Sequence, residues 1–497
     1  MPKKYKIVYI GAGSFRFTVP CGMNVLDFAE SFHPVELWFV DINPERLKLM
    51  GEGMRQMIYM HRKDIELHLT TDRTKALENA DYVLVSISIG MQRAEWFDIH
   101  IPLKFGLPQN TGDTVGPGGI MRAVRTIPVY MEIFKDVSEM CPNATILSYT
   151  NPQSSLMLSV FQNYPNLQAV GLCHELFYVQ SKKFGKYLTL CGAEKKEENH
   201  VTFKYGGLNH FSWILELEYN GKDLYPQMRE NAQFAYESGK FGRPFNYRLL
   251  NLYDYFPYPG DRHVAEFIPR YYNYFNHNDN PFGITELRNV RGINIQRRLV
   301  DSLIQWAKSD RNRWFIWLVA RPMEGGEKAL LMAKDRERNL PKHHVCNVLN
   351  KGIIPSLPEN CVVEVPCYFE DGKLFPSKIG PLPKQVNELV MPHAKNHQNI
   401  VNAALSGDPE DLLKALLADP MCQFIEDEEK IEALMYNMLH YERRWYPKFS
   451  ESIPSFQEIK KMKYHVLPKE LMTYKDARRE KYSPDPDLKS KAWPQAG

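Results

Sequence analysis

The first half of the chain alternates short apolar runs with longer stretches of mixed character. Apolar, β-branched runs stand at residues 6–10 (KIVYI), 36–40 (ELWFV), 65–70, 82–89 (YVLVSISI) and 145–149. Each run has the length and composition of a strand, and the stretches between the runs are long enough for helices. This alternation predicts an α/β fold in which a doubly wound, Rossmann-like parallel sheet carries helices on both faces.

From residue 201 the pattern changes. A strand-like segment reaches residue 217, an aromatic, Pro-rich stretch covers 247–274, and a helical period follows around 296–306. Residues 361–366 (CVVEVP) predict one more strand. Residues 399–421 predict two helices that are separated at the breaker sequence Gly407-Asp408-Pro409.

These changes predict three parts of the chain. The Rossmann-like domain covers residues 1–200, and an α+β domain covers residues 201–465. Residues 466–497 are rich in Lys, Pro and Asp and poor in apolar residues, which is typical of a loosely held tail or of an arm that reaches a neighbouring subunit.

Composition excludes several classes of protein. The 497 residues are 44% hydrophobic and 24% charged, which excludes disordered and fibrous chains. Lys and Arg total 62 against 59 Asp and Glu, so the basic field needed for nucleic-acid or membrane-surface binding is absent. We expect a cytoplasmic protein with reduced cysteines, because no apolar run is long enough for a membrane span or a signal-peptide core. Its expected partners are small molecules and copies of itself.

The first strand ends in a glycine turn, GAGSFR at residues 11–16. Such a turn lets backbone N–H groups at a helix N-terminus face a pyrophosphate. Arg16 replaces the third glycine of the usual fingerprint, but Asp41 ends the next strand, where a carboxylate can accept the ribose hydroxyls and disfavour a 2′-phosphate. NAD is therefore predicted over NADP, and a tight turn without a ligand is the structural alternative. The candidate cofactor-binding residues are Gly11, Gly13, Ser14, Phe15, Arg16 and Asp41.

A cysteine and a histidine in two separate motifs are candidate metal ligands. The motifs are GLCHE at residues 171–175 and GLNHFSW at residues 207–213. The thiolate of Cys173 and the imidazole of His210 can converge on one divalent ion and leave positions open for substrate oxygens. The alternatives are a buried cysteine that acts as a small hydrophobe and a hydrogen-bonded core histidine.

Two further motifs are typical of ligand-binding loops. The loop TGDTVGPGG at residues 111–119 can approach a ligand closely, with Arg122 and Arg125 in the helix that follows, although it can also be a long structural turn. TNP at residues 150–152 ends a strand at the edge where doubly wound sheets hold ligands. Asn151 is therefore predicted to contact nicotinamide or substrate, or to form an Asx turn.

Together and in this order, the motifs GAGS, TGDTVGPGG, TNP, GLCHE, GLNHFSW and CVVEVPCYF resemble the NAD- and divalent-metal-dependent glycoside hydrolases of family 4. The resemblance spans most of the chain. It implies NAD, a divalent ion that is usually manganese, and a homodimer or homotetramer. It also implies a route that differs from two-carboxylate hydrolysis: C3 of the sugar is oxidised, C2 is deprotonated, the leaving group is eliminated, water adds and C3 is reduced again.

The resemblance also implies roles for individual residues. Cys173 and His210 match the metal ligands of the family, Asn151 matches a substrate-binding asparagine, and Asp113 matches an acidic residue that raises the basicity of the catalytic base. His174 stands where 6-phospho-α-glucosidases carry an aspartate thought to protonate the leaving group.

The catalytic base varies within the family. We predict Asp261 of the segment PGDRH at residues 259–263, with Tyr258 as the second choice. Asp is common in turns beside Gly and Pro, so a loop cap is the structural alternative for Asp261.

The sequence Cys-His-Glu at residues 173–175 bears on the substrate. It comes closest to Cys-His-Glu-Val, which resembles α-galacturonidases, with Leu176 in place of Val. Cys-His-Ser resembles α-glucosidases and α-galactosidases, Cys-His-Gly resembles α-glucuronidases, and Cys-Asp or Cys-Asn resembles phosphoglycosidases. A uronic acid needs a cation for its carboxylate, ideally a guanidinium. The candidates are Arg93, Arg122, Arg262 and Arg291.

Two other classes share part of these motifs. A 2-hydroxyacid dehydrogenase would have the glycine turn, Asp41 and the TNP strand end, but it would need a His–Asp pair and a clamping arginine and would not need Cys173. A non-catalytic NAD-sensing scaffold is the third option, because a fold does not determine a function.

Overall fold

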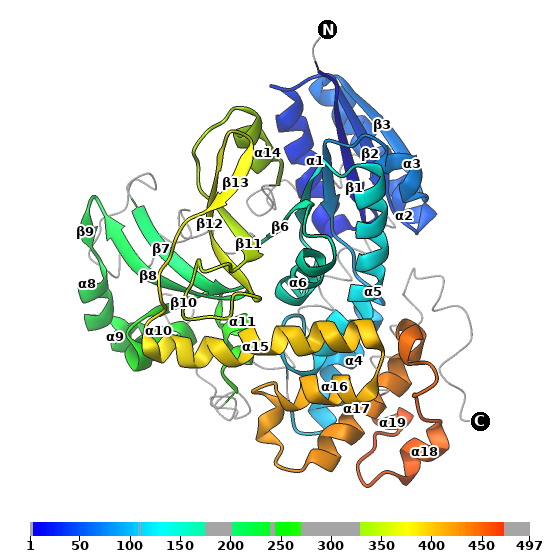
Figure 1. Cartoon of the computed structure of the whole chain (residues 1–497), viewed down its shortest axis with the longest axis vertical. Coiled ribbons are helices and arrows are strands. Elements are labelled where there is room, and N and C mark those ends of the chain that lie inside the picture. The colour runs from blue at the N-terminus through cyan, green and yellow to red at the C-terminus, as the bar shows by residue number, and fades with distance from the viewer. Residues whose placement is uncertain are drawn as a thin grey trace.

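The computed structural model of the chain describes residues 3–107, 109, 111–173, 201–238, 244–269 and 329–471. Its N-terminal part contains parallel strands joined by helices (Figure 1). The elements are β1 (Tyr5–Ile10), α1 (Phe15–Ala29), β2 (Val35–Val40), α2 (Pro44–His61), β3 (Ile65–Thr70), α3 (Arg73–Leu77), β4 (Tyr82–Val85), α4 (Met91–Lys104), α5 (Gly116–Met140), β5 (Thr145–Ser148), α6 (Gln153–Asn163) and β6 (Gln168–Leu172). These strands lie in the order β3-β2-β1-β4-β5-β6, the doubly wound order of dinucleotide-binding folds. The predicted Rossmann-like sheet is confirmed.

The second part of the chain extends the same sheet. Its strands are β7 (Val201–Leu208), β8 (Phe211–Tyr219), β9 (Lys222–Asp223), β10 (Phe256–Tyr258), β11 (His344–Leu349), β12 (Val362–Glu370) and β13 (Lys373–Pro376). β11 pairs antiparallel with β6, β12 with β11, and β7 with β12. Backbone hydrogen bonding therefore continues from one predicted domain into the other, and the predicted boundary at residue 200 lies outside the described residues.

The second part of the chain also contains helices. They are α8 (Tyr225–Glu230), α9 (Ala232–Ser238), α10 (Pro244–Tyr253), α11 (Asp261–Phe267), α14 (Ala329–Glu337), α15 (Lys384–Ser406), α16 (Pro409–Leu417), α17 (Glu428–Glu442), α18 (Phe456–Lys461) and α19 (Pro468–Leu471). None of the helices within the described ranges combines the length and apolar character that a membrane span requires.

The strand-like segment predicted over residues 201–217 is a hairpin in the structure. β7 ends at Leu208, the chain reverses at Asn209 and His210, and β8 returns from Phe211. His210 has a φ of +62°, a backbone conformation that residues other than Gly seldom adopt. The reversal puts His210 at the tip of the hairpin.

The break predicted at Gly407 to Pro409 is confirmed. Gly407 ends α15 with a φ of +72°, and the Asp408 side chain caps α16 by accepting the N–H of Glu410 at 2.9 Å. α15 begins at Lys384, well before the predicted start at residue 399. The helix packs against α5, α6 and β7, and such tertiary contacts supply most of the stability of a helix. Figure 1 shows α15 passing beneath both parts of the sheet.

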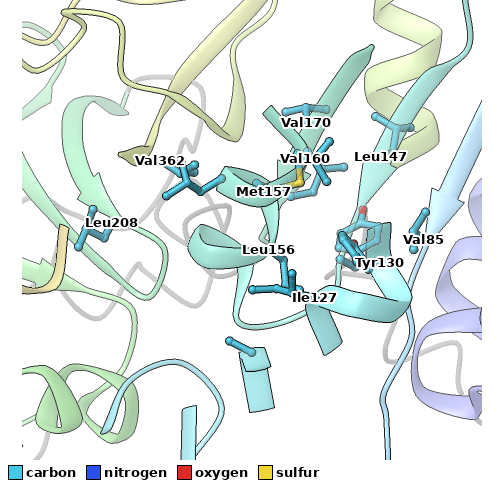
Figure 2. Packing of buried hydrophobic residues seen from close by; sticks show 14 of the residues in the cluster. Val85, Ile127, Tyr130, Leu147, Leu156, Met157, Val160, Val170, Leu208 and Val362 are labelled. Atoms are coloured by element: carbon cyan, nitrogen blue, oxygen red, sulfur yellow. The ribbon is translucent and has the colours of Figure 1, made fainter. Parts of the chain in front are cut away.

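Buried apolar side chains from both parts of the chain form one large core cluster. Figure 2 shows a portion of it, with Leu147 of β5, Val170 of β6 and Met157 of α6. Leu208 of β7 and Val362 of β12 belong to the same cluster. Because burial of apolar surface is the main stabilising contribution to folding, this shared core holds the hairpin of β7 and β8 against the Rossmann part.

A buried ion pair holds the helix that follows the glycine loop. Arg125 of α5 donates two hydrogen bonds to Asp98 of α4, at 2.8 and 2.5 Å, and one to Glu442 of α17 at 3.2 Å. Arg125 is 2% exposed. A guanidinium held in this way is structural, and it ties α4, α5 and α17 together.

The glycine turn after β1 leaves no room for a side chain at Gly11. Its φ is +95°, and a Cβ atom would stand 1.9 Å from the carbonyl oxygen of Ser86. Gly106 has a similar φ of +90°, but a Cβ atom there would have no neighbour within 4 Å. A side chain at Gly106 would therefore meet backbone strain alone, whereas a side chain at Gly11 would meet both strain and steric overlap.

We expect Gly106→Ala to lower the free energy of unfolding by about 1–2 kcal/mol through backbone strain. Gly11→Ala should lower it by about 1–3 kcal/mol more, because a packed backbone must also move. Urea denaturation of both variants without cofactor measures the difference. Equal losses in the two variants would contradict the overlap at Gly11.

Candidate active site

The glycine turn and Asp41 contact each other directly. The N–H of Gly13 donates to Oδ2 of Asp41 at 2.8 Å, and the N–H of Asn43 donates to Oδ1 at 2.8 Å. A Cβ atom at Gly13 would stand 2.7 Å from the carboxyl carbon of Asp41, so glycine is needed for this approach. Ser14 caps α1 by accepting the N–H of Phe17 at 3.4 Å.

This arrangement fits a dinucleotide. The first turn of α1 has the open N-terminal N–H groups that bind a pyrophosphate. Phe15 is buried beside the turn, and the side chain of Arg16 lies outside the described residues. A contact of Asp41 with ribose stays a prediction.

Three distant segments meet at Asp113, His210 and His263. Asp113 precedes α5, His210 is at the tip of the β7–β8 hairpin, and His263 is in α11. Each residue offers one possible ligand atom, and these atoms lie within 4.8 Å of one another. Oδ1 of Asp113 is 3.6 Å from Nδ1 of His263 and 4.0 Å from Nδ1 of His210.

The Thr114 hydroxyl bridges two members of this group. It donates to Oδ1 of Asp113 at 2.7 Å and lies 2.8 Å from Nδ1 of His210. A hydroxyl has one proton to donate, so Thr114 must accept at its second contact and Nδ1 of His210 must carry a proton. When the ring is neutral, its lone pair is then on Nε2, which is the arrangement of a metal-binding histidine whose other nitrogen donates a hydrogen bond.

Asp113 is ionised in this site. Burial alone would raise its pKa, but the nearby His263 and His210 and the Arg122 guanidinium together hold the pKa well below its usual range. The site therefore combines one carboxylate with two imidazoles. Such an oxygen and nitrogen donor set suits a divalent first-row metal ion.

Glu266 fixes the loop that carries Asp113. Its carboxylate accepts the N–H of Thr111 at 2.7 Å, the hydroxyl of Thr111 at 2.9 Å and the N–H of Gly112 at 3.1 Å. Burial raises the pKa of Glu266 to about 7, against the opposing effect of these backbone hydrogen bonds. His263 and Glu266 are three residues apart on α11, so one helix face holds the loop at two points.

Cys173 does not belong to the group formed by Asp113, His210 and His263. It is buried directly after β6, at the edge of a described range. Its predicted partnership with His210 on a metal stays a prediction. His174 lies outside the described residues.

Asp261 caps a helix in the structure. Its two carboxylate oxygens accept the N–H groups of Phe245 and Asn246 at 3.2 Å each, at the start of α10. These are the contacts expected of a cap, which the sequence left as the alternative to a base. Tyr258 is 1% exposed on β10, opposite Ser212 of β8. The identity of the base stays a prediction.

The predicted substrate-binding residues differ in their positions. Arg122 is half-buried on α5, and its charge acts on Asp113. Arg93 is half-buried in the first turn of α4, Arg262 is exposed on α11, and Asn151 is half-buried after β5. Arg291 lies outside the described residues.

Sequence reasoning missed the roles of Thr114, His263 and Glu266. The signal that could have found two of them is the spacing in residues 261–267 (DRHVAEF), where a histidine and a glutamate share one helix face. Thr114 had no such signal, because only the fold brings it to His210.

Comparisons with known proteins match nearly the whole chain. The model of the family 4 glycosyl hydrolases matches residues 6–189, and the model of their C-terminal domain matches residues 205–422. An alpha-galactosidase of Bacillus subtilis is 32% identical over 428 residues, which cover 84% of this chain and 93% of the relative. The chain belongs to glycosyl hydrolase family 4.

Other members of family 4 resemble the chain over similar lengths. An alpha-galacturonidase of Thermoanaerobacter italicus is 30% identical over 462 residues, covering 88% of this chain and 98% of the relative. The solved structure of a 6-phospho-alpha-glucosidase from gut microorganisms, in complex with NAD and Mn²⁺, has a TM-score of 0.73 at 18% identity and covers 90% of this chain and 99% of its own. Family membership favours a glycosidase over the dehydrogenase and scaffold alternatives.

We expect His263→Ala to weaken divalent-metal binding by about tenfold or more, because the variant loses a ring that either ligates the metal or orients its other ligands. Titration of the metal-free protein with Mn²⁺, followed by electron paramagnetic resonance, measures the affinity. An unchanged affinity in His263→Ala together with a lost affinity in Cys173→Ser would exclude His263 from the site.

Proposed function

We propose that this family 4 glycosidase hydrolyses α-galacturonides, with NAD and Mn²⁺ as cofactors. The observation that carries the substrate assignment is the sequence Cys-His-Glu at residues 173–175. It agrees with the name of the Thermoanaerobacter italicus relative, whose length the chain matches almost completely. A relative of similar identity is named an alpha-galactosidase, so a neutral α-galactoside is the second candidate.

The proposal assigns the cofactors to two neighbouring parts of the site. NAD would lie on the glycine turn, where the N-terminus of α1 offers N–H groups. The metal would be held by His210 through Nε2, together with members of the set Cys173, Asp113 and His263. When bound, NAD supplies a hydride acceptor for C3 of the sugar, and the metal supplies a Lewis acid.

The residues of the chain then prepare the sugar for loss of the C2 proton. Asp113 holds negative charge beside the two imidazoles, and this charge raises the pKa of a nearby proton acceptor and so makes it a stronger base. Asp261 is the first candidate for that acceptor and Tyr258 the second. A base at this position would be identified by exchange of the C2 hydrogen with solvent deuterium, which its removal would abolish.

Arg122 is the proposed partner of the uronate carboxylate. It is the predicted substrate arginine whose positive charge contributes to the lowered pKa of Asp113. A guanidinium can bind a carboxylate through two parallel hydrogen bonds. Asn151, at the end of β5, is proposed to hold a sugar hydroxyl.

We also propose that the protein works in the cytoplasm as a homodimer or homotetramer, as the family resemblance implies. Size-exclusion chromatography with light scattering measures the assembly, and a monomer at micromolar concentration would contradict it.

Activity toward nitrophenyl α-glycosides tests the substrate. With NAD, Mn²⁺ and a thiol reductant, kcat/KM for the galacturonide should exceed that for the galactoside by about 100-fold or more, because a site built for a carboxylate is left with an unpaired charge by a neutral sugar. Chelation of the metal and Cys173→Ser should each abolish turnover, while NAD still binds. A preference for the neutral galactoside would mean that the substrate is an α-galactoside and not an α-galacturonide. Turnover without metal would reject the mechanism.

Arg122→Met tests the proposed carboxylate partner. It should lower kcat/KM for the galacturonide by about 10- to 100-fold, the effect of losing a hydrogen bond to a charged group. The galactoside serves as the internal control and should lose much less. Equal losses for the two substrates would mean that Arg122 acts through Asp113 and not on the uronate.

A further inference from the structure

A row of small and polar residues crosses the sheet from the Rossmann part to β10. Neighbouring members of the row are paired in the strand register. The row contains Ser148 of β5, Gly171 of β6, Asn347 of β11, Glu364 of β12, Gly207 of β7, Ser212 of β8 and Tyr258 of β10. Glu364, from the motif CVVEVP, has no role in the proposed chemistry, although it is the ionisable carboxyl group of this row.

Glu364 is buried and accepts hydrogen bonds from three side chains. It is 2% exposed. Its Oε2 accepts from the amide of Asn209 at 2.9 Å and from the amide of Asn347 at 3.2 Å, and its Oε1 accepts from the hydroxyl of Ser212 at 2.8 Å. A buried acid of this kind is costly unless its oxygens are satisfied, so the three donors and Glu364 constrain one another.

Two of these donors lie on either side of His210. Asn209 precedes it directly, and Ser212 follows it by two residues. His210 itself has a φ of +62°, a backbone conformation that persists only where the surroundings impose it. Glu364 binds both sides of this reversal from the neighbouring strand β12.

We propose that Glu364 is a positioning residue that holds the β7–β8 turn in the conformation in which His210 reaches Thr114, Asp113 and His263. The carboxylate acts as the common acceptor for Asn209 and Ser212, so the turn cannot relax without breaking a buried hydrogen bond. Asn347 orients the carboxylate from the other side. The consequence for metal binding rests on the proposed function, whereas the consequence for the position of His210 does not.

Substitution of Glu364 by two residues separates positioning from simple packing. Glu364→Met retains the approximate volume but accepts no hydrogen bond, so the buried amides of Asn209 and Asn347 lose this acceptor and the hydroxyl of Ser212 keeps only its contact with the carbonyl oxygen of Leu208 at 3.2 Å. Glu364→Gln keeps one acceptor oxygen, and the amides of Asn209 and Asn347 can turn to accept from its amide group. We therefore expect the glutamine to restore the turn and the methionine to disrupt it.

The matched control is Glu337→Met. Glu337 of α14 accepts the hydroxyl of Tyr5 at 2.7 Å and also that of Tyr82, at the amino ends of β1 and β4. Its loss removes a half-buried carboxylate that accepts from two tyrosine hydroxyls and from Arg336 at 2.9 Å, at a part of the sheet that carries no site residue. It should lower stability without affecting His210.

The experiment reads the imidazole of His210 in the metal-free protein. Protein labelled at histidine Cε1 gives one carbon signal for each ring by nuclear magnetic resonance, and His210→Gln assigns the signal of interest. Glu364→Met should shift or broaden this signal and weaken Mn²⁺ binding by about tenfold or more, with NAD affinity unchanged. Glu364→Gln should stay close to the wild type in all three measurements, and so should Glu337→Met.

An unchanged His210 signal and Mn²⁺ affinity in a folded Glu364→Met would overturn the proposal. If Glu364→Met does not fold, Asn209→Ala and Ser212→Ala replace it, because each removes one donor and retains the carboxylate. Wild-type properties in both would overturn the proposal equally. Absence of Mn²⁺ binding in the wild type would reject the proposed function, while the His210 signal would still decide the role of Glu364.

Discussion

The single proton of the Thr114 hydroxyl is the constraint on which the proposed chemistry depends. That proton goes to Asp113, so the hydroxyl oxygen must accept from Nδ1 of His210. One hydroxyl thereby selects the tautomer of His210 and leaves the lone pair of Nε2 available to a metal. It also links the loop before α5 with the β7–β8 hairpin, across 96 residues of sequence. Without this contact, the carboxylate and the imidazole would be near each other but would have no defined protonation.

The surrounding structure imposes this contact from two sides. Glu266 binds the backbone of Thr111 and Gly112 and so holds the loop, while Glu364 binds the side chains beside His210 and so holds the hairpin. Both acids are buried, where a carboxylate is tolerated only if its oxygens are hydrogen-bonded. The continuous pairing of β6, β11, β12 and β7 joins the strand that carries Glu364 to the hairpin on one side and to the Rossmann part on the other. The sheet thus both buries the apolar core and brings Glu364 to the polar side chains beside His210.

The same architecture serves different sugars within family 4. The solved 6-phospho-alpha-glucosidase shares the fold with a TM-score of 0.73 at only 18% identity, and relatives of this chain are named for galactosides and galacturonides. Substrate choice must therefore lie in a few side chains around the common site and not in the sheet. In this chain the candidates for that role are the Cys-His-Glu sequence and the arginines, and the charge of Arg122 acts on Asp113.

The amino-acid sequence by itself determined the features that depend on neighbouring residues. The strands of the Rossmann sheet, the glycine turn after β1 and the break between α15 and α16 follow from apolar periodicity, from the freedom of Gly11 and Gly407 to take a positive φ, and from the cap at Asp408. Only the tertiary structure decided that His263 joins Asp113 and His210, that Asp261 caps α10 and that Cys173 lies outside the group. The reason is that these contacts join segments far apart in the chain, such as Thr111 and Glu266 at 155 residues. Local sequence cannot encode which of many polar side chains will meet, because antiparallel pairing of distant strands makes that choice.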